Sequence, residues 1–282
     1  MPPPDPDPQS PATLLGLARE RIAALSTALT PESFTITAET RGVITRALGG
    51  EGADYLDKFI LLETALGWGS AFCPHHDRHT EGRAIGADAR VLRSGHVCVD
   101  IAALDAAAIA IRMQPSHSVT AGGTTHQKGK VRAELVAAEV DRVLPSAGPA
   151  RVLLVGVTAA MVEVLVERGH SVLASDLDPE IIGSEVHGVR VHPGTETPQL
   201  LAEADAAVIS GMTTTTETVD DVVAAAVAGD VPLIVFAQTG GRLFPLMLGH
   251  CSGAVVAELF PFYMLSGNTT FDIYRFARES HR

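Results

Sequence analysis

The sequence predicts an α/β protein: a Rossmann-like, doubly wound parallel sheet forms the C-terminal half, and a smaller α+β domain precedes it. Residues 151–155 are an apolar, β-branched run that ends at Gly156. Apolar side chains then recur at helical spacing over residues 157–168. A second strand follows at 171–174, with Asp176 just beyond its end. Strand, glycine turn, helix, strand and acid form the first half of a mononucleotide-binding unit.

The same alternation continues to the end of the chain, which favours a parallel sheet with helices on both faces. A last strand at 271–276 is expected at the edge of that sheet. The remaining expected strands are 205–210, 231–237 and 254–258, and the remaining helices are 197–203, 217–228 and 242–249.

The first half is less regular. We expect a proline-rich leader at 1–11, an α+β domain at 12–147 and the Rossmann-like domain at 148–282, joined at a Pro/Gly-rich linker. Residues 55–68 are apolar enough for a buried strand or a buried helix, and periodicity does not decide between them. The other expected elements are helices at 13–29, 41–50, 100–112 and 130–144, a strand at 33–37 and a loop at 115–129. In the last helix Val131, Leu135, Ala138 and Leu144 are expected to face inward.

Charge and composition narrow the class of protein. The chain has 33 acidic and 21 basic residues, a net charge of −12, and this argues against binding to nucleic acid or to an anionic membrane surface. Three scattered cysteines do not form a disulfide framework, and no apolar run has transmembrane length. We therefore expect a cytoplasmic protein that acts on a small molecule. The sequence does not decide the oligomeric state, and a homodimer is one alternative.

The turn after the first parallel strand limits the ligand. A dinucleotide fingerprint needs glycines where this chain has Val157 to Ala160, and a Walker motif is absent. Asp176 lies 20 positions after Gly156, the spacing at which a carboxylate usually binds ribose hydroxyls. The pattern favours an adenosine ligand without phosphates, of which S-adenosylmethionine (SAM) is the common example; the alternative is a Rossmann-like half that binds nothing.

Two further loops are expected at the same edge of the sheet. If 151–155 is the central strand, its neighbour across the switch in strand order should be 205–210. The hydroxyl-rich loop from Ser210 to Glu217 then faces the ligand, unless Thr214 and Glu217 only form a capping box. Gln238 opens the next loop. Aromatic residues, Trp68 among them, either lie over a sulfonium or belong to the core.

A cluster of metal-ligating residue types stands in the first half. Cys73, His75, His76 and His79 fall within seven positions. A zinc site usually draws on a second cluster, and the H-E-x-x-H pattern is absent, so we assign no metal ligands. A metal-binding or metal-chelating module stays as an alternative function.

The C-terminal half resembles a Rossmann-like family that is named after heavy-metal chelation. The resemblance lies in the run from Arg151, in the segment Ala207 to Thr213, in Val219–Asp221 and in Leu233–Thr239. It implies an enolase-like N-terminal domain at 12–147. The chain departs from the family at Thr216, where the family has Asn, and at Ala237–Gln238, where it has Gly-Pro.

A subset of such Rossmann-like proteins resembles azetidine-2-carboxylate synthases, which consume SAM. The resemblance implies a cyclase acting on the C–S bond: the α-amine of SAM attacks its own Cγ and methylthioadenosine leaves. The product is azetidine-2-carboxylate or, as an alternative, 1-aminocyclopropane-1-carboxylate, and a SAM-dependent methyltransferase is the second alternative. The candidate catalytic residues are Ser210, Thr213 and Gln238; the candidate SAM-binding residues are Gly156, Val157, Asp176, Leu177, Gly211, Met212 and Trp68.

Overall fold

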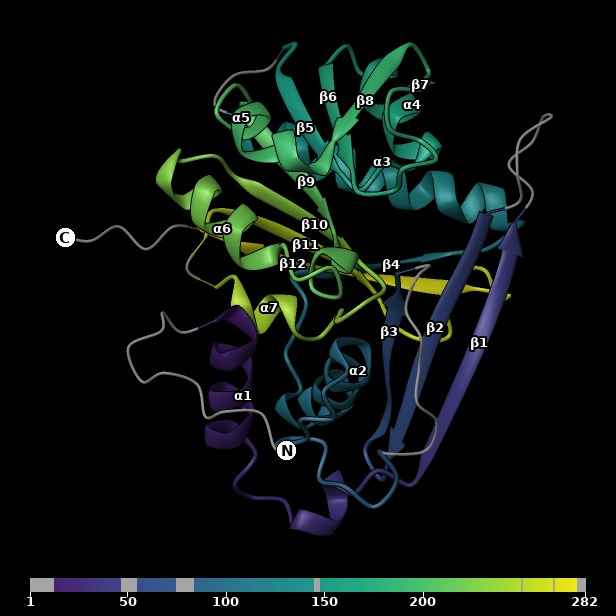
Figure 1. Ribbon diagram of the computed structural model, residues 1–282, viewed down its shortest axis with the longest axis vertical. Helices are drawn as coiled ribbons and strands as arrows, with labels where there is room; N and C mark the ends of the chain where they lie inside the picture. Colours follow the sequence, from purple (N-terminus) through teal and green to yellow (C-terminus); the bar gives the residue numbers. More distant parts are fainter. Residues whose placement is uncertain are drawn as a thin grey trace.

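The computed structural model describes residues 13–46, 55–74, 84–144, 148–249, 251–265 and 267–277. They form a nine-stranded sheet and a separate three-stranded sheet, with helices packed on both (Figure 1). The helices are α1 (Leu14–Leu25), α2 (Val97–Ala108), α3 (Thr125–Val143), α4 (Ala159–Glu167), α5 (Thr197–Leu201), α6 (Val219–Ala228) and α7 (Phe244–Met247). The strands are β1 (Ala38–Arg46), β2 (Tyr55–Thr64), β3 (Gly67–Cys73), β4 (His117–Ala121), β5 (Arg151–Val155), β6 (Ser171–Asp176), β7 (Glu185–Val186), β8 (Val189–Pro193), β9 (Ala206–Ser210), β10 (Leu233–Ala237), β11 (Gly253–Glu258) and β12 (Thr269–Phe276).

The large sheet confirms the predicted fold class. Its strand order is β4-β12-β11-β10-β9-β5-β6-β8-β7, and the strands from β11 to β8 in that order are mutually parallel. From β5 the chain builds outward through β6 and β8, then returns to place β9 on the other side of β5 and continues to β10 and β11. The order therefore reverses between β5 and β9, where the sequence predicted it, and ligands of open α/β sheets bind at such a point.

Successive residues of the central strands face two different cores. Val152 and Leu154 pack with α3 and α4, whereas Leu153 packs with α5, α6 and α7 on the opposite face. All three side chains are fully buried. Burial on both faces explains why the parallel strands read as continuous apolar runs rather than as alternating ones.

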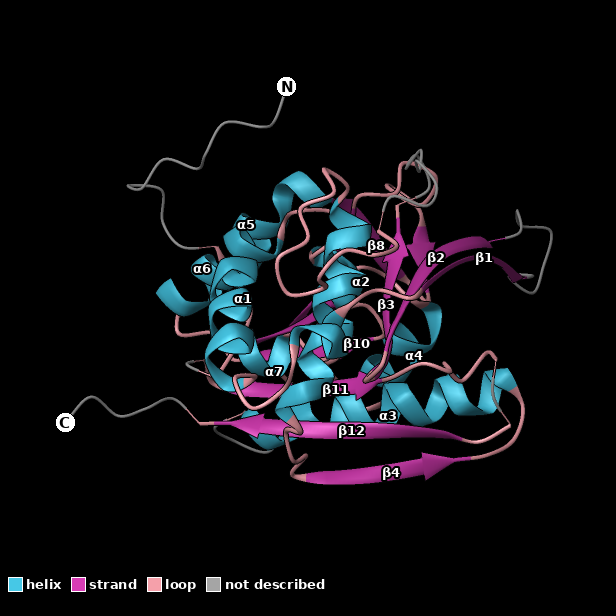
Figure 2. Cartoon of the chain, turned by 90° about the horizontal axis from the view of Figure 1, so that it is seen from below, coloured by secondary structure: helices cyan, strands magenta, loops and turns pink. Residues whose placement is uncertain are grey.

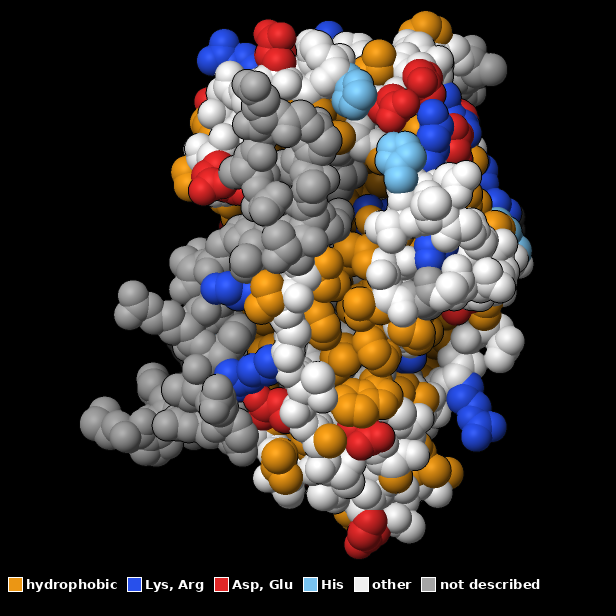
Figure 3. Space-filling model, turned by 90° about the vertical axis from the view of Figure 1, so that its right-hand side faces the viewer, with side chains coloured by type: hydrophobic (Ala, Val, Ile, Leu, Met, Phe, Trp, Pro, Cys, Tyr) orange, Lys and Arg blue, Asp and Glu red, His pale blue; other side chains and the backbone are white. Residues whose placement is uncertain are grey.

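The small sheet is an antiparallel meander, β1-β2-β3, covered on one face by α2. Ile60 and Leu62 face α2, while Phe59 and Leu61 join an aromatic cluster on the other face. The helix approaches closely at Gly69, where a Cβ atom would lie 2.1 Å from the carbonyl oxygen of Ala102. Hydrophobic side chains gather across the middle of the side of the molecule that β1 and β2 border (Figure 3).

Three sequence expectations change, and one that was open is decided. Residues 41–46 continue strand β1 instead of a helix, because they pair along their length with β2. The undecided segment 55–68 is strand β2, a turn and the start of β3. The predicted loop at 115–129 contains β4 and the start of α3. Residues 271–276 do form a strand, yet β12 is not at the edge, because β4 pairs with its outer side (Figure 2). The pairing of β4 with β12 joins segments far apart in the sequence, so the local periodicity of either segment does not predict it.

The division into domains also looks different in three dimensions. Strand β4 and helix α3 precede the boundary expected at 147–148, yet β4 extends the large sheet and α3 packs on its strands. The most buried apolar residues of α3 are Ala133, Val136, Ala137 and Val140. Of the residues expected to face inward, Val131, Leu135 and Leu144 are only partly buried against this core, and Ala138 is exposed. The expected leader at 1–11 lies outside the described residues.

Candidate functional site

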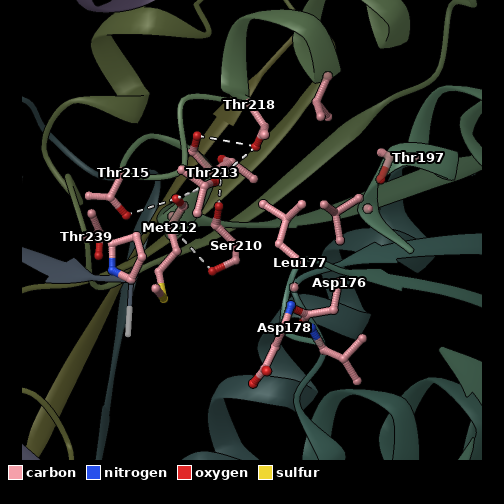
Figure 4. Close-up of a pocket in the computed structure, with 18 of the residues that line it drawn as sticks. Asp176, Leu177, Asp178, Thr197, Ser210, Met212, Thr213, Thr215, Thr218 and Thr239 are labelled. Carbon is pink, nitrogen blue, oxygen red and sulfur yellow. Dashed lines mark hydrogen bonds between the residues drawn. The ribbon is translucent and has the colours of Figure 1, made fainter. Parts of the chain in front are cut away.

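A cavity of about 910 Å³ lies at the carboxyl edge of the parallel strands, where the strand order reverses. Asp176 and Leu177 line one side, Met212, Thr215 and Thr239 the other, and Ser210 stands between them (Figure 4). Two strands, β5 and β9, separate the ends of β6 and β10, so the cavity spans about 14 Å across the sheet. Of the ten predicted site residues, all but Trp68 line this cavity.

The turn after β5 is held by Asp176. Gly156 has φ +85°, and a Cβ atom there would lie 2.7 Å from the Cβ of Ser210. The N–H of Val157 donates to one Asp176 carboxylate oxygen at 2.7 Å, and the N–H of Asp178 donates to the other at 2.9 Å. A phosphate therefore finds the Val157 N–H already engaged. Each carboxylate oxygen of Asp176 keeps further acceptor capacity for a ligand hydroxyl.

The loop after β9 presents threonine hydroxyl oxygens whose protons are already committed. Thr213 donates to the carbonyl of Ser210 at 2.8 Å, and Thr215 donates to the carbonyl of Met212 at 3.0 Å. The Ser210 hydroxyl accepts from the N–H of Met212 at 3.2 Å. The loop is pressed against its neighbour at Gly211, where a Cβ would lie 2.7 Å from the carbonyl oxygen of Thr239. Donating threonines retain free lone pairs, so this wall of the cavity is mainly an acceptor of hydrogen bonds.

The capping box considered for this loop does not form. Thr214 donates to the carbonyl of Gly211 at 2.7 Å, and α6 begins after Thr218, which makes no side-chain cap. Glu217 has φ +57° and precedes that cap residue. The threonine run thus begins in a short 3-10 helix, Gly211–Thr213, that Ser210 caps, and it is not the first turn of α6.

Gln238, after β10, is oriented by a buried glutamate. Its amide nitrogen donates to Glu258 at 2.8 Å, which leaves the amide oxygen without a partner in the described part of the chain. Glu258 is 1% exposed and also accepts from the hydroxyl of Thr269 at 2.9 Å and from the N–H of Tyr263. Burial raises the pKa of Glu258, and the nearby Arg132 guanidinium opposes that rise.

Arg132 is a lining residue that the sequence analysis missed. It lies on α3, is 7% exposed, and its Nε atom is buried without a hydrogen-bond partner. Its guanidinium carbon lies 5.4 Å from the ring centre of Phe236 and 5.0 Å from that of Tyr263. The sequence does contain a signal for its burial, because Arg132 lies one helical turn before the apolar Val136. The face that the sequence predicts to point inward runs instead through Val131 and Leu135, one residue away.

The charges around the cavity are mostly negative. Arg132 is the one basic side chain among the described residues that line it. The acidic residues that line it are Asp176, Asp178, Glu180, Glu217 and Asp221. Glu180, Glu217 and Asp221 are exposed at the rim, so solvent screens them more than the half-buried Asp176 and Asp178. The potential favours a cationic ligand over a polyanionic one.

Trp68 stands apart from the cavity. Its ring centre lies 6.3 Å from that of Phe260, within the aromatic cluster beside β2 and β3. Phe72 belongs to that cluster and does line the cavity, and so does Tyr263 from the segment after β11. The aromatic side chains nearest a ligand are therefore Phe72, Phe236 and Tyr263.

The metal-ligating cluster is only partly described. His75, His76 and His79 lie outside the described residues, and Cys73 is buried at the end of β3. Among the residues that the structure does describe, no three His, Cys, Asp or Glu side chains come together as a metal site. These residues alone do not fit a bound metal ion. No helix in the same part of the chain has the length and apolar character that crossing a bilayer requires.

Comparison with known proteins supports the fold and a family likeness. Residues 140–235 match the family DUF364, described as "Putative heavy-metal chelation". Two crystal structures of DUF364 proteins of unknown function have the same overall fold. The protein from Desulfitobacterium hafniense has a TM-score of 0.53 at 14% identity, covering 90% of this chain and 98% of its own. The protein from Pyrococcus horikoshii has a TM-score of 0.54 at 12% identity, covering 93% and 99%. No curated protein matches the chain.

Proposed function

We propose that the cavity binds S-adenosylmethionine and that the protein consumes it as its only substrate, closing the aminobutyrate part to a small-ring amino acid. The observation that carries the proposal is the charge and hydrogen-bonding character of the cavity. Among the described residues that line it, acids and hydrogen-bond acceptors predominate and one arginine is present. A ligand with a sulfonium, an ammonium and one carboxylate matches this set of groups, whereas a dinucleotide brings two phosphates to an acidic wall.

The position of each group along the cavity suggests how the ligand is held. Asp176 is the acceptor for the ribose hydroxyls, beside the Gly156 turn. The hydroxyl groups of Ser210 and Thr213 lie near the middle of the cavity, where the sulfonium is expected. Gln238 follows at the far side with an unpartnered amide oxygen, which can accept a hydrogen bond from the α-amine.

The reaction is a substitution within one molecule. The neutral α-amine donates its lone pair to Cγ, the Cγ–S bond breaks, and its electron pair neutralises the sulfonium. The products are methylthioadenosine, azetidine-2-carboxylate and the proton that the ammonium lost. An amine with a pKa near about 8 is already partly neutral at neutral pH, so a weak acceptor such as Gln238 suffices. The main contribution of the protein is to hold nitrogen in line with the C–S bond.

Incubation with SAM alone tests the proposal. We expect methylthioadenosine and an amino acid that is lighter than homoserine by one water. Azetidine-2-carboxylate, 1-aminocyclopropane-1-carboxylate and homoserine lactone share that mass, so chromatography against the three standards must accompany mass spectrometry. SAM recovered intact beside a folded, SAM-bound protein contradicts the cyclase.

The two alternative functions give different results in the same design. A methyltransferase yields S-adenosylhomocysteine, and only after an acceptor is added. A metal-chelating module is the second alternative, and it agrees with the name of the matching family. Such a protein retains stoichiometric zinc or nickel in elemental analysis and loses the metal when His75, His76 and His79 are replaced by alanine.

A further inference from the structure

The Arg132 guanidinium is a buried cation with an unfilled hydrogen-bonding capacity. Its Nε atom has no partner, and no hydrogen bond or ion pair to the side chain is found among the described residues. Stacking near Phe236 and Tyr263 compensates for part of the lost hydration. A guanidinium carries five N–H donors, so two aromatic rings leave its donors unsatisfied.

The nearby acid, Glu258, does not accept hydrogen bonds from the Arg132 guanidinium. Glu258 faces Arg132 electrostatically, but its oxygens accept from Gln238, Thr269 and Tyr263, and the two side chains form no ion pair. The other acids that line the cavity follow β6 or lie in the Glu217–Asp221 segment, and none of them forms an ion pair with Arg132 in the described part of the chain. The Arg132 donors are left for a group that enters the cavity.

We propose that Arg132 is the carboxylate receptor of the cavity and that it selects ligands whose amino-acid end carries a free carboxylate. The identification of that ligand as SAM rests on the function proposed above. A planar guanidinium matches a carboxylate with two parallel hydrogen bonds, and the rings of Phe236 and Tyr263 hold its plane and exclude water. Gln238 donates a hydrogen bond to Glu258, and Arg132 interacts electrostatically with the same carboxyl group. Arg132 and Gln238 therefore lie on the same side of the cavity, where they can bind the carboxylate and the amine of one α-amino acid together.

Two matched ligands and two variants test the assignment. SAM and decarboxylated SAM share the adenosyl, sulfonium and amine groups and differ in the carboxylate. We expect wild-type protein to bind SAM about 10- to 100-fold more tightly in calorimetry, the range for hydrogen bonds to a charged group. R132M should remove this preference while changing the affinity for decarboxylated SAM and methylthioadenosine less than about threefold. R132K should restore part of it, because the charge remains and the planar fork is lost.

Thermal stability separates a receptor from a structural role. Replacing an arginine that awaits a ligand breaks no hydrogen bond or ion pair among the described residues. It removes only the ring contacts and the attraction to Glu258, so the ligand-free R132M variant should unfold close to the wild-type temperature. A lower unfolding temperature for R132M, with equal losses of affinity for SAM and decarboxylated SAM, overturns the proposal.

A further measurement keeps the inference independent of SAM. If wild-type protein binds neither SAM nor decarboxylated SAM, the proposed function has failed, and a simple carboxylate then decides the role of Arg132. Sodium acetate, compared with sodium chloride at equal ionic strength, should raise the unfolding temperature of wild type more than that of R132M. An equal effect on both proteins contradicts a carboxylate receptor.

Discussion

The carboxylate of Asp176, at the end of β6, accepts a hydrogen bond of 2.7 Å from the N–H of Val157, in the turn after β5. Its second oxygen accepts from the N–H of Asp178 at 2.9 Å. The same side chain lines the cavity. Asp176 thus fixes the conformation of the Gly156 turn and offers its remaining lone pairs to a ligand, two roles that a substitution can separate.

Replacing Asp176 distinguishes these roles. D176A should weaken SAM binding by about 1–3 kcal/mol, because a charged hydrogen-bond acceptor is lost, and should also free the Val157 N–H. D176N removes the charge and keeps one acceptor oxygen, which can serve either the Val157 N–H or the Asp178 N–H but not both. It should therefore lose less thermal stability than D176A while its affinity for SAM still falls. Calorimetry and thermal unfolding of both variants provide the check. Unchanged SAM affinity in folded D176A contradicts a ribose contact.

Gly156 and Gly169 form a matched pair for testing the turn. Both have φ +85°, but a Cβ at 156 would lie 2.7 Å from the Cβ of Ser210, whereas nothing lies within 4 Å of one at 169. Alanine at either position incurs the left-handed backbone cost of about 1–2 kcal/mol. G156A should cost more than G169A in chemical denaturation, because the turn must also move away from β9.

The same comparison tests whether the contact between the turn and β9 shapes the cavity. G156A is expected to weaken SAM binding, while G169A, at the far end of α4, should leave it unchanged. Equal losses of stability in the two variants, with equal SAM affinities, contradict the importance of the Gly156–Ser210 contact.

The sequence allowed the parallel half to be predicted because its signals are local. The run 151–155, the glycine at 156 and the acid at 176 mark consecutive elements, and the topology of a doubly wound sheet then brings Ser210 beside Gly156. Strand β4 could not be predicted, because it owes its place to pairing with β12, about 150 residues later. Arg132 was missed for a related reason: the inward face of α3 depends on how the helix rotates against the sheet, and a shift of one position exchanges Val131 for Arg132.

Glu139 gives the stability of the chain a predictable pH dependence. It is buried on α3, and its carboxylate binds Arg142 at 2.5 Å and Arg275 of β12 at 2.7 Å. Burial raises the pKa of Glu139, but the hydrogen bonds and charges of the two arginines outweigh burial and lower it overall. A carboxyl whose pKa is lower in the folded state stabilises the fold above its unfolded pKa, and this stabilisation is lost as the pH falls through the folded value.

We therefore expect E139Q to unfold about 1–3 kcal/mol more easily than wild type at neutral pH, with the difference shrinking as both proteins are acidified below about pH 4. The control is E163Q, which breaks the half-exposed pair between Glu163 and Lys130, leaves Lys130 its second partner Glu167, and should cost less than about 1 kcal/mol. Denaturant unfolding at a series of pH values measures both. A constant difference between E139Q and wild type across that range contradicts the assignment of the lowered pKa to Glu139.

Gln238 is expected to act on the substrate amine rather than on the adenosyl group. Its amide nitrogen donates to Glu258 at 2.8 Å, and this hydrogen bond fixes the orientation of the amide group. The Gln238 side chain lines the cavity on the wall that follows β10. Q238A should lower the rate of methylthioadenosine release from SAM by about 10- to 100-fold, the effect of losing one hydrogen bond to a reacting group. Binding of methylthioadenosine itself, which has no amine tail, should stay within about twofold of wild type. Q199A, at an exposed glutamine of α5, is the matched control and should behave as wild type in both measurements. If Q238A weakens methylthioadenosine binding as much as it slows turnover, Gln238 shapes the adenosyl site instead, and the orientation of the amine must come from another group.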